Sequence, residues 1–459
     1  MLTALTRRAR LLTGGEGLMP RALRGSAVTM LGFGGSVFVR LAGNLILTRL
    51  LFPEAFGLMA LVTVLMVGIA MLSDVGLGLS IQQSPRGDDT LFLGTCWSVQ
   101  LLRTVILFIL ACIIALPAAT FYGAPDLALL LPAASLTMLI EGFTPIRKEV
   151  AIRHLRLGRL TALDIVAQVV GLITMIVLAY ATRSVWALVF GSIAGAVVKL
   201  ALITLFLPGP RIPPAWDRTA LDEILRFGIW VFFSSLCGFL IQQGDRAILG
   251  AYLTLDQLGI YNIGFFLASF PLMLGHALAG RVLVPFYREA AAATDPVATR
   301  RRMRRMRGGL TALLMAPLLV LAFGATPLVG VLYDPRYADA AGVLAALAAA
   351  QAFQIVGVTY DQAALAAGNS RGFFVVVATR SAIQTAAVLI GLNLGGFPGA
   401  LVAYGLGVAV QHLFVIRLAR QHGVWDPVHD AVALALALPL IALALWLNAP
   451  ALAALATFG

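Results

Sequence analysis

The chain has 459 residues, of which 60% are hydrophobic and only 12% are charged. A soluble domain carries about 25% charged residues, so this composition excludes a water-facing surface over most of the molecule and predicts a membrane protein. The formal net charge of +12 is interpreted as basic loops beside a membrane lined by anionic lipids, and we expect no nucleic acid as a partner.

Since a span needs about 20 apolar residues, we predict thirteen spanning helices and an all-α polytopic membrane protein. The first six cover residues 27–48, 57–82, 92–121, 127–146, 160–181 and 185–207. The other seven cover residues 224–251, 258–284, 309–332, 341–366, 372–393, 397–418 and 430–448. The apolar tail after residue 448 is too short to span alone, which leaves an interfacial end or a truncated fourteenth helix.

Basic residues favour one orientation of the chain. With the N-terminus in the cytoplasm, the inner segments hold 24 of the 33 lysine and arginine residues, the outer loops hold three, and six lie within predicted spans. Cytoplasmic loops carry an excess of Lys and Arg, so this asymmetry predicts a cytoplasmic N-terminus. The densest cluster, residues 300–307, is interpreted as a topology anchor on anionic lipids, with the gathering of a pyrophosphate headgroup as the alternative.

The sequence contains a repeat with an offset of 202 residues. Residues 46–60 align without gaps on residues 248–262, and six predicted helices separate the copies. The matched positions include Glu54 with Asp256 and Gly57 with Gly259. An even number of helices between the copies gives both the same orientation, which predicts two six-helix lobes related by a pseudo-two-fold axis along the membrane normal, plus one or two C-terminal helices.

This arrangement predicts the domain bounds. We expect an N-terminal cytoplasmic tail, an N-lobe, a cytoplasmic linker, a C-lobe and a C-terminal helix with a short tail, at residues 1–26, 27–207, 208–223, 224–420 and 421–459.

Ionisable side chains within the predicted spans are the candidate functional groups. The cations are Arg40, Arg103, Lys199, Arg246, Arg281 and Arg380. The acids are Asp74, Glu141, Asp164, Asp245 and Asp361, with His276 and His412 as further titratable groups. Each charge near the centre of a span costs about 2.5–3.5 kcal/mol on insertion scales, so we expect these groups to face a polar interior, most simply a cavity between the lobes.

A cavity lined by these cations indicates an anionic cargo, because guanidinium groups bind phosphate oxygens through paired donors. Asp74, Glu141, Asp245 and Asp361 could couple transport to H⁺ or Na⁺, or they could neutralise neighbouring cations. Asp164, Arg281 and Asp361 lie nearer the predicted cytoplasmic ends, where snorkelling to the interface also explains them. We expect no metal and no organic cofactor, since the sequence has no HExxH and no CxxC motif.

Two segments resemble the bacterial polysaccharide flippases, the Wzx-type branch of the multidrug/oligosaccharidyl-lipid/polysaccharide (MOP) exporter superfamily. That family has an R-L-L-x-P-x-x-F-G turn followed by D-x-G-L-G and a Gln. The matching residues here are Arg49, Leu50, Leu51, Pro53, Phe56, Gly57, Asp74, Gly76, Leu77, Gly78 and Gln82. A second segment, from Asp245-Arg246 to Leu258-Gly259-Ile260-Tyr261, is similar to the family's D-R-x-x-(I/L)-G and L-G-x-Y motifs.

The resemblance covers about residues 20–420 and is strongest to the exopolysaccharide branch. It implies a non-enzymatic inner-membrane protein, expected as a monomer, that moves undecaprenyl-diphosphate-linked oligosaccharide to the periplasmic leaflet by alternating access. It also implies membrane lipids as partners, together with a polysaccharide polymerase and glycosyltransferases. The alternatives are a cation-coupled drug or metabolite exporter of the same superfamily and a membrane glycosyltransferase or polymer ligase.

Overall fold

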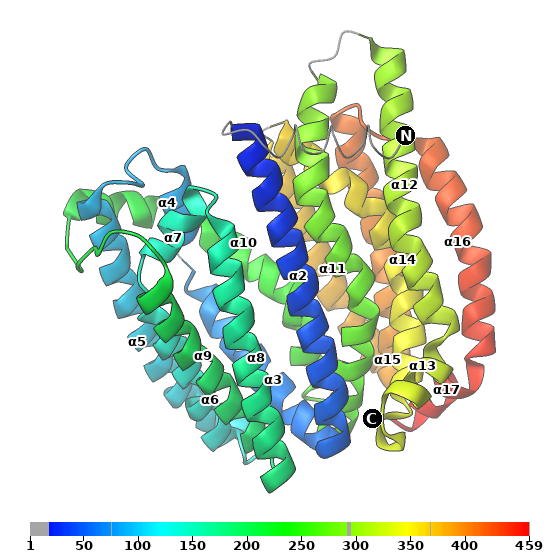
Figure 1. Cartoon of the computed structure of the whole chain (residues 1–459). Coiled ribbons are helices and arrows are strands. Elements are labelled where there is room, and N and C mark those ends of the chain that lie inside the picture. The colour runs from blue at the N-terminus through cyan, green and yellow to red at the C-terminus, as the bar shows by residue number, and fades with distance from the viewer. Residues whose placement is uncertain (1–17, 75, 292–294, 368, 459) are drawn as a thin grey trace, which may run out of the picture. The chain divides into compact units, whose positions relative to one another are not determined.

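The computed structural model describes residues 18–458 apart from residues 75, 292–294 and 368, and these residues form helices with no strand (Figure 1). The predicted all-α fold is therefore confirmed. The earlier helices are α2 (Leu18–Leu50), α3 (Pro53–Leu72), α4 (Leu77–Gln83), α5 (Thr90–Phe121), α6 (Leu127–Gly142), α7 (Arg147–Arg153), α8 (Leu157–Thr182), α9 (Trp186–Phe206) and α10 (Arg218–Leu249). The later ones are α11 (Leu255–Ala291), α12 (Pro296–Phe323), α13 (Ala325–Leu332), η1 (Pro335–Tyr337), α14 (Ala340–Ala366), α15 (Ser370–Gln421), α16 (Pro427–Leu447), α17 (Ala449–Ala454) and η2 (Leu455–Thr457).

The helices form two compact units. Unit 1 comprises the described residues up to Leu51 together with Leu65–Ser235, and unit 2 comprises Phe52–Val64 together with the described residues from Leu236 onward. Both α3 and α10 therefore contribute to both units. The predicted domain bounds and the pseudo-two-fold relation of the lobes stay predictions.

Nine helices among the described residues are long and apolar enough to cross a membrane, or ten if α6 and α7, which meet at a 66° bend, form one span. The predicted spans all lie in helices, but several are interrupted. The span predicted at 57–82 is divided into α3 and α4, and the span predicted at 309–332 breaks at Gly324 between α12 and α13. Helix α15 holds two predicted spans, joined at Gly395 and at Gly396, whose φ of 61° only glycine adopts readily.

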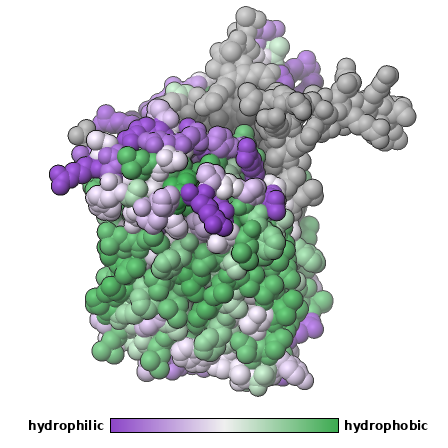
Figure 2. All heavy atoms as spheres, turned by 60° about the vertical axis from the view of Figure 1, so that its left-hand side comes forward, coloured by the Kyte–Doolittle hydropathy of each residue, from purple (hydrophilic) through white to green (hydrophobic). Residues whose placement is uncertain are grey.

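The surface has the distribution of side chains that a membrane requires. The face seen in Figure 2 carries a broad apolar band, with hydrophilic side chains gathered beyond one of its edges. Large apolar side chains on α5 and α9, such as Ile113, Leu116 and Leu205, are more than 60% exposed. Since a soluble protein of this kind would expose a very large hydrophobic patch to water, this surface faces lipid.

The two copies of the repeat contact each other within unit 2. A Cβ atom placed on Gly57 would lie 1.9 Å from the carbonyl oxygen of Leu255, and one placed on Gly259 would lie 2.0 Å from that of Pro53. The backbone N–H of Glu54 donates to Asp256 Oδ1 at 3.0 Å. The 202-residue offset maps Gly57 onto Gly259 and Pro53 onto Leu255, so the two glycine contacts are equivalent, and it maps Glu54 onto its own partner Asp256. Helices α3 and α11 therefore cross about a local two-fold axis, at a separation that only glycine allows.

In unit 1, α8 packs against α9 and against α2 (Figure 1). Small residues allow the close approach of α8 and α9, because a Cβ on Gly171 would lie 3.0 Å from the carbonyl oxygen of Gly191. Helix α2 is fixed to α8 by Ser36, whose hydroxyl donates to Gln168 Oε1 at 2.7 Å. These three helices carry Arg40, Asp164 and Lys199.

Candidate functional site

The break between α3 and α4 explains Arg103. The last carbonyls of a helix have no partner within the helix, and Arg103 on α5 supplies one: its Nε donates to the carbonyl oxygen of Ser73 at 2.9 Å, and its Nη2 donates to that of Ala70 at 2.6 Å. Asp74 forms the turn, since its Oδ1 accepts from the N–H of Gly76 at 2.9 Å. Arg103 thus caps an interrupted helix.

Lys199 lies in a cluster of three charged groups in unit 1. Its Nζ lies 3.3 Å from Glu141 Oε1 and 3.7 Å from Asp164 Oδ1. The three side chains come from α9, α6 and α8 and are 27%, 55% and 41% exposed, respectively. With one cation and two carboxylates, the cluster carries a net negative charge when all three groups are ionised.

Arg40 takes part in neither of these contacts. It is exposed on α2, one turn after Ser36, which holds α2 to α8. Within unit 1, the structure therefore places Arg40, Arg103 and Lys199 in three different surroundings: a helix surface, the cap of a broken helix, and an ion-pair cluster.

In unit 2, Asp245 and Arg246 both contact α11 and do not pair with each other. Asp245 is 5% exposed and accepts a hydrogen bond from Tyr261 Oη at 2.5 Å. The guanidinium of Arg246 lies 4.2 Å from the centroid of the Phe265 ring, and its Nη1 donates to Gln243 Oε1 at 2.9 Å. A cation–π contact of this kind holds the charge without neutralising it.

Of the remaining candidates, Arg380 is half-buried on α15. Its Nη2 lies 3.8 Å from the position that a Cβ on Gly357 would occupy, and His412 Nδ1 lies 3.4 Å from the same point. The side chains of Arg281 and Asp361 lie outside the described residues.

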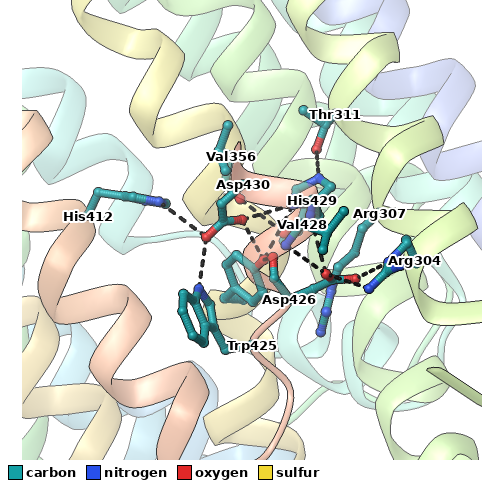
Figure 3. Close-up of polar contacts among 12 residues, drawn as sticks. Arg304, Arg307, Thr311, Val356, His412, Trp425, Asp426, Val428, His429 and Asp430 are labelled. Atoms are coloured by element: carbon teal, nitrogen blue, oxygen red, sulfur yellow. Dashed lines mark hydrogen bonds and ion pairs between the residues drawn. The ribbon is translucent and has the colours of Figure 1, made fainter. Parts of the chain in front are cut away.

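A buried polar cluster joins α14, α15 and α16 in unit 2 (Figure 3). At its centre, Asp430 is 5% exposed and accepts hydrogen bonds from Tyr360 Oη at 2.6 Å and from Trp425 Nε1 at 3.0 Å. Its carboxylate also lies 3.0 Å from His429 Nδ1 and 3.6 Å from His412 Nε2. A buried carboxylate with this many partners is a strong constraint on how the three helices pack.

Helix α12 is tied to the same cluster by three side chains. Arg304 Nε and Nη2 form a paired contact with the Asp426 carboxylate at 2.6 and 3.0 Å. Thr311 Oγ1 lies 2.9 Å from His429 Nε2, and the guanidinium of Arg307, which is 2% exposed, lies 4.7 Å from the Tyr360 ring centroid.

Asp426 is also the N-cap of α16, accepting from the N–H groups of Val428 and His429. Although burial favours the neutral acid, the hydrogen bonds from Arg304 and from the His429 N–H hold the pKa of Asp426 below its usual value. Asp426 and Arg304 are therefore both charged at neutral pH.

Sequence reasoning missed Asp426, His429 and Asp430 as a functional or structural group, and interpreted Asp164 as a snorkelling residue. A signal for Asp164 exists: it is the eighth residue of α8, and Lys199 is the eighth residue from the end of α9. Antiparallel neighbours with these positions place both side chains at one depth. Within the part of the chain that the structure describes, no group of three or more His, Cys, Asp or Glu residues could hold a metal ion.

Solved structures of membrane transporters have a similar fold. The structure is similar to a lipid II flippase, MurJ, in an inward closed conformation, with a TM-score of 0.68, 13% identity, and coverage of 92% of this chain and 91% of that one. It is also similar to an inward-facing multidrug resistance MATE family transporter of the MOP superfamily, with a TM-score of 0.63, 15% identity, and coverage of 85% and 96%. At these identities the likeness concerns the fold.

The sequence identifies the family. The polysaccharide biosynthesis protein family matches residues 46–342, and the chain belongs to it. The chain is 24% identical over 364 residues to the succinoglycan biosynthesis transport protein ExoT of Rhizobium meliloti, covering 78% of this chain and 72% of that protein. It is 27% identical over 254 residues to the amylovoran biosynthesis protein AmsL of Erwinia amylovora, covering 54% and 64%.

Proposed function

We propose that this protein is an inner-membrane flippase that moves an oligosaccharide linked to undecaprenyl diphosphate from the cytoplasmic to the periplasmic leaflet for exopolysaccharide synthesis. The observation that carries the proposal is the combination of a polysaccharide biosynthesis family match with the fold of a lipid II flippase. The relatives in succinoglycan and amylovoran biosynthesis support an exopolysaccharide as the product. The positive-inside asymmetry supports a cytoplasmic N-terminus.

The cargo diphosphate would be held by basic side chains within the spans, because guanidinium groups bind phosphate oxygens through paired donors. Arg103 and Lys199 already have partners within unit 1. Arg40, which is exposed, and Arg246, which contacts an aromatic ring and an amide and forms no ion pair with a described carboxylate, are therefore the better candidates to bind phosphate. Arg281 and Arg380 remain candidates.

Coupling to H⁺ or Na⁺ would need a buried acid that is not already paired with a cation. Glu141 pairs with Lys199, and Asp74 caps a turn. Asp245 is buried, with Oδ2 bonded to Tyr261 and Oδ1 without a hydrogen-bond partner among the described residues. Asp245 is thus the most suitable of these acids to bind a coupling ion, and Asp361 remains a candidate.

The proposal is tested with the purified protein in liposomes that contain a fluorescent undecaprenyl-diphosphate sugar, with dithionite quenching as the measure of transbilayer movement. We expect the wild type to accelerate movement at least tenfold, and the Arg40→Gln/Arg246→Gln variant to lose most of this rate. Arg417→Gln is the control, because Arg417 is exposed on α15 and outside the candidate set.

Three results would count against parts of the proposal. Wild-type rates from the double variant would reject these two arginines as the phosphate site. No movement of the lipid-linked sugar, with ethidium exported instead, would favour the drug exporter, an alternative supported by the similarity of fold to a MATE transporter. Sugar transfer without transbilayer movement would favour an enzyme, although ExoT is named as a transport protein and the structural neighbours as a flippase and a transporter.

A further inference from the structure

An open groove runs between α12 and α16 in unit 2, and it is apolar except at one end. Its volume is about 320 Å³. Arg304, Thr311 and His429 form the polar end. The rest of the lining is aliphatic, from residues such as Leu319 on α12 and Leu436 on α16.

The lining of the groove follows helical periodicity. On α12 it includes Arg304, Gly308, Thr311, Met315 and Leu319, which recur at intervals of three or four residues and lie on one stripe. From Arg304 to Leu319 this stripe is about 22 Å long at 1.5 Å per residue. One leaflet of the hydrocarbon core is about 15 Å thick, so the groove can hold one acyl chain along its length.

Gly308 opens the groove between Arg304 and Thr311. It is exposed, and a Cβ atom placed there would meet nothing within 4 Å. The side chains opposite, on α16, include Val432 at 53% and Leu436 at 66% exposed. Among the described residues of unit 2, none lies within 4 Å of this Cβ position, and in a bilayer a lipid chain would fill the space.

The polar end has a strong positive charge. Residues 300–307 contain six arginines and no acid, and Arg301 lies one turn before Arg304 on the same side of α12, just beyond the end of the groove. Asp426 occupies Nε and Nη2 of Arg304, and Nη1 is not part of that pair. A phosphate beside Arg301 and Arg304 would contact two guanidinium groups at the polar end of the groove.

We propose that the groove between α12 and α16 binds a bilayer glycerophospholipid with an anionic headgroup, such as phosphatidylglycerol. Its headgroup lies at Arg301 and Arg304, and one acyl chain lies over Gly308 toward Leu319. The lipid fixes α16 against α12 beside the Asp426–Arg304 contact. This inference does not depend on the flippase proposal, since it concerns the lipid that surrounds the protein and not the cargo.

The test is native mass spectrometry of the full-length protein titrated with palmitoyl-oleoyl phosphatidylglycerol, with the phosphatidylcholine of the same chains as the comparison lipid. Gly308→Leu places a side chain in the groove. Gly309→Leu is its matched control, because Gly309 is also exposed with nothing within 4 Å of its Cβ position but does not line the groove. Arg301→Gln is compared with Arg302→Gln, which removes the same charge about 100° around the helix.

We expect one phosphatidylglycerol site with at least fivefold tighter binding than phosphatidylcholine. Gly308→Leu and Arg301→Gln should each weaken it at least fivefold, and the two control variants should change it less than twofold. Equal binding of both lipids, or unchanged phosphatidylglycerol binding in Gly308→Leu, would overturn the proposal. Displacement of the lipid by undecaprenyl diphosphate at equal concentration would also overturn it and would assign the groove to cargo.

Discussion

Replacing Gly57 or Gly259 by alanine is expected to weaken the crossing of α3 and α11. The added methyl carbon at Gly57 would lie 1.9 Å from the carbonyl oxygen of Leu255, and that at Gly259 would lie 2.0 Å from the carbonyl oxygen of Pro53. Both obstacles are backbone atoms, so no side-chain rotation can relieve either clash. The two helices must move apart by more than 1 Å for the methyl group to reach normal contact distance, since atoms in contact lie roughly 3.5 Å apart.

The magnitude follows from two opposing effects. Overpacking a well-packed site typically costs about 1–3 kcal/mol, and a backbone obstacle places this site toward the upper end. Alanine in place of glycine in a helix recovers about 1 kcal/mol. The net destabilisation should be about 2 kcal/mol for each substitution. Because both methyl groups push apart the same pair of helices, the double variant should lose less than the sum of the two single losses.

Thermal unfolding in detergent measures the effect, with Gly330→Ala as the control. Gly330 is exposed in α13 and would meet nothing within 4 Å, so its replacement should leave the melting temperature unchanged or raise it. We expect each crossing variant to melt several degrees below the wild type. Wild-type melting in both single variants would show that α3 and α11 do not pack closely at these glycines. Strict additivity in the double variant would show that the two positions act independently, and either result would remove the argument for a local two-fold axis.

Three further outcomes follow from the contacts described above. Arg103→Gln should destabilise the fold by about 1–3 kcal/mol in denaturant titration, because it leaves the last carbonyls of α3 without a donor; an unchanged midpoint would contradict the capping role. Asp430→Asn should cost about 3 kcal/mol by weakening a buried network, which wild-type melting would disprove. Asp217 lies just before α10, and hydrogen bonds from Thr219 and then from Arg86 lower its pKa to about 2. The contribution of the Asp217 carboxylate to stability is therefore complete above about pH 4 and should disappear as the pH falls toward 2. Asp217→Asn should melt below the wild type at pH 5 but not at pH 2.

The sequence predicted where the helices are because hydropathy is a property of each segment. It did not predict how they are interrupted. Residues 57–82 are mostly apolar and were predicted as one span, yet the helix ends at Leu72 and resumes at Leu77. The turn depends on Gly76, which has a φ of 64°, and on a donor from Arg103, which is distant in sequence. A single segment carries no information about such a donor, so the break could not be located from hydropathy alone.

The candidate site was predicted less completely, for a related physical reason. The free energy of inserting a charged side chain into a membrane indicates that the charge needs a partner, but it does not indicate which residue that partner is. Arg103 donates to backbone carbonyls, Lys199 pairs with two carboxylates, and Arg246 lies over an aromatic ring. Asp164 was assigned to the interface because it lies near a helix end, although α9 places Lys199 at the same depth.

These different partners divide the basic residues into two classes, which can be distinguished by measuring transport and stability together. Arg103 and Arg153 donate to carbonyls at the ends of α3 and α4, respectively, so each satisfies backbone groups that a membrane would otherwise leave unpaired. Their replacement should reduce stability and transport together. Arg246 does not hold a helix end, and its loss should reduce transport with little change in melting temperature. If Arg246→Gln destabilises as much as Arg103→Gln, then the cation over Phe265 is a structural element, and the cargo phosphate must be sought at the other basic residues.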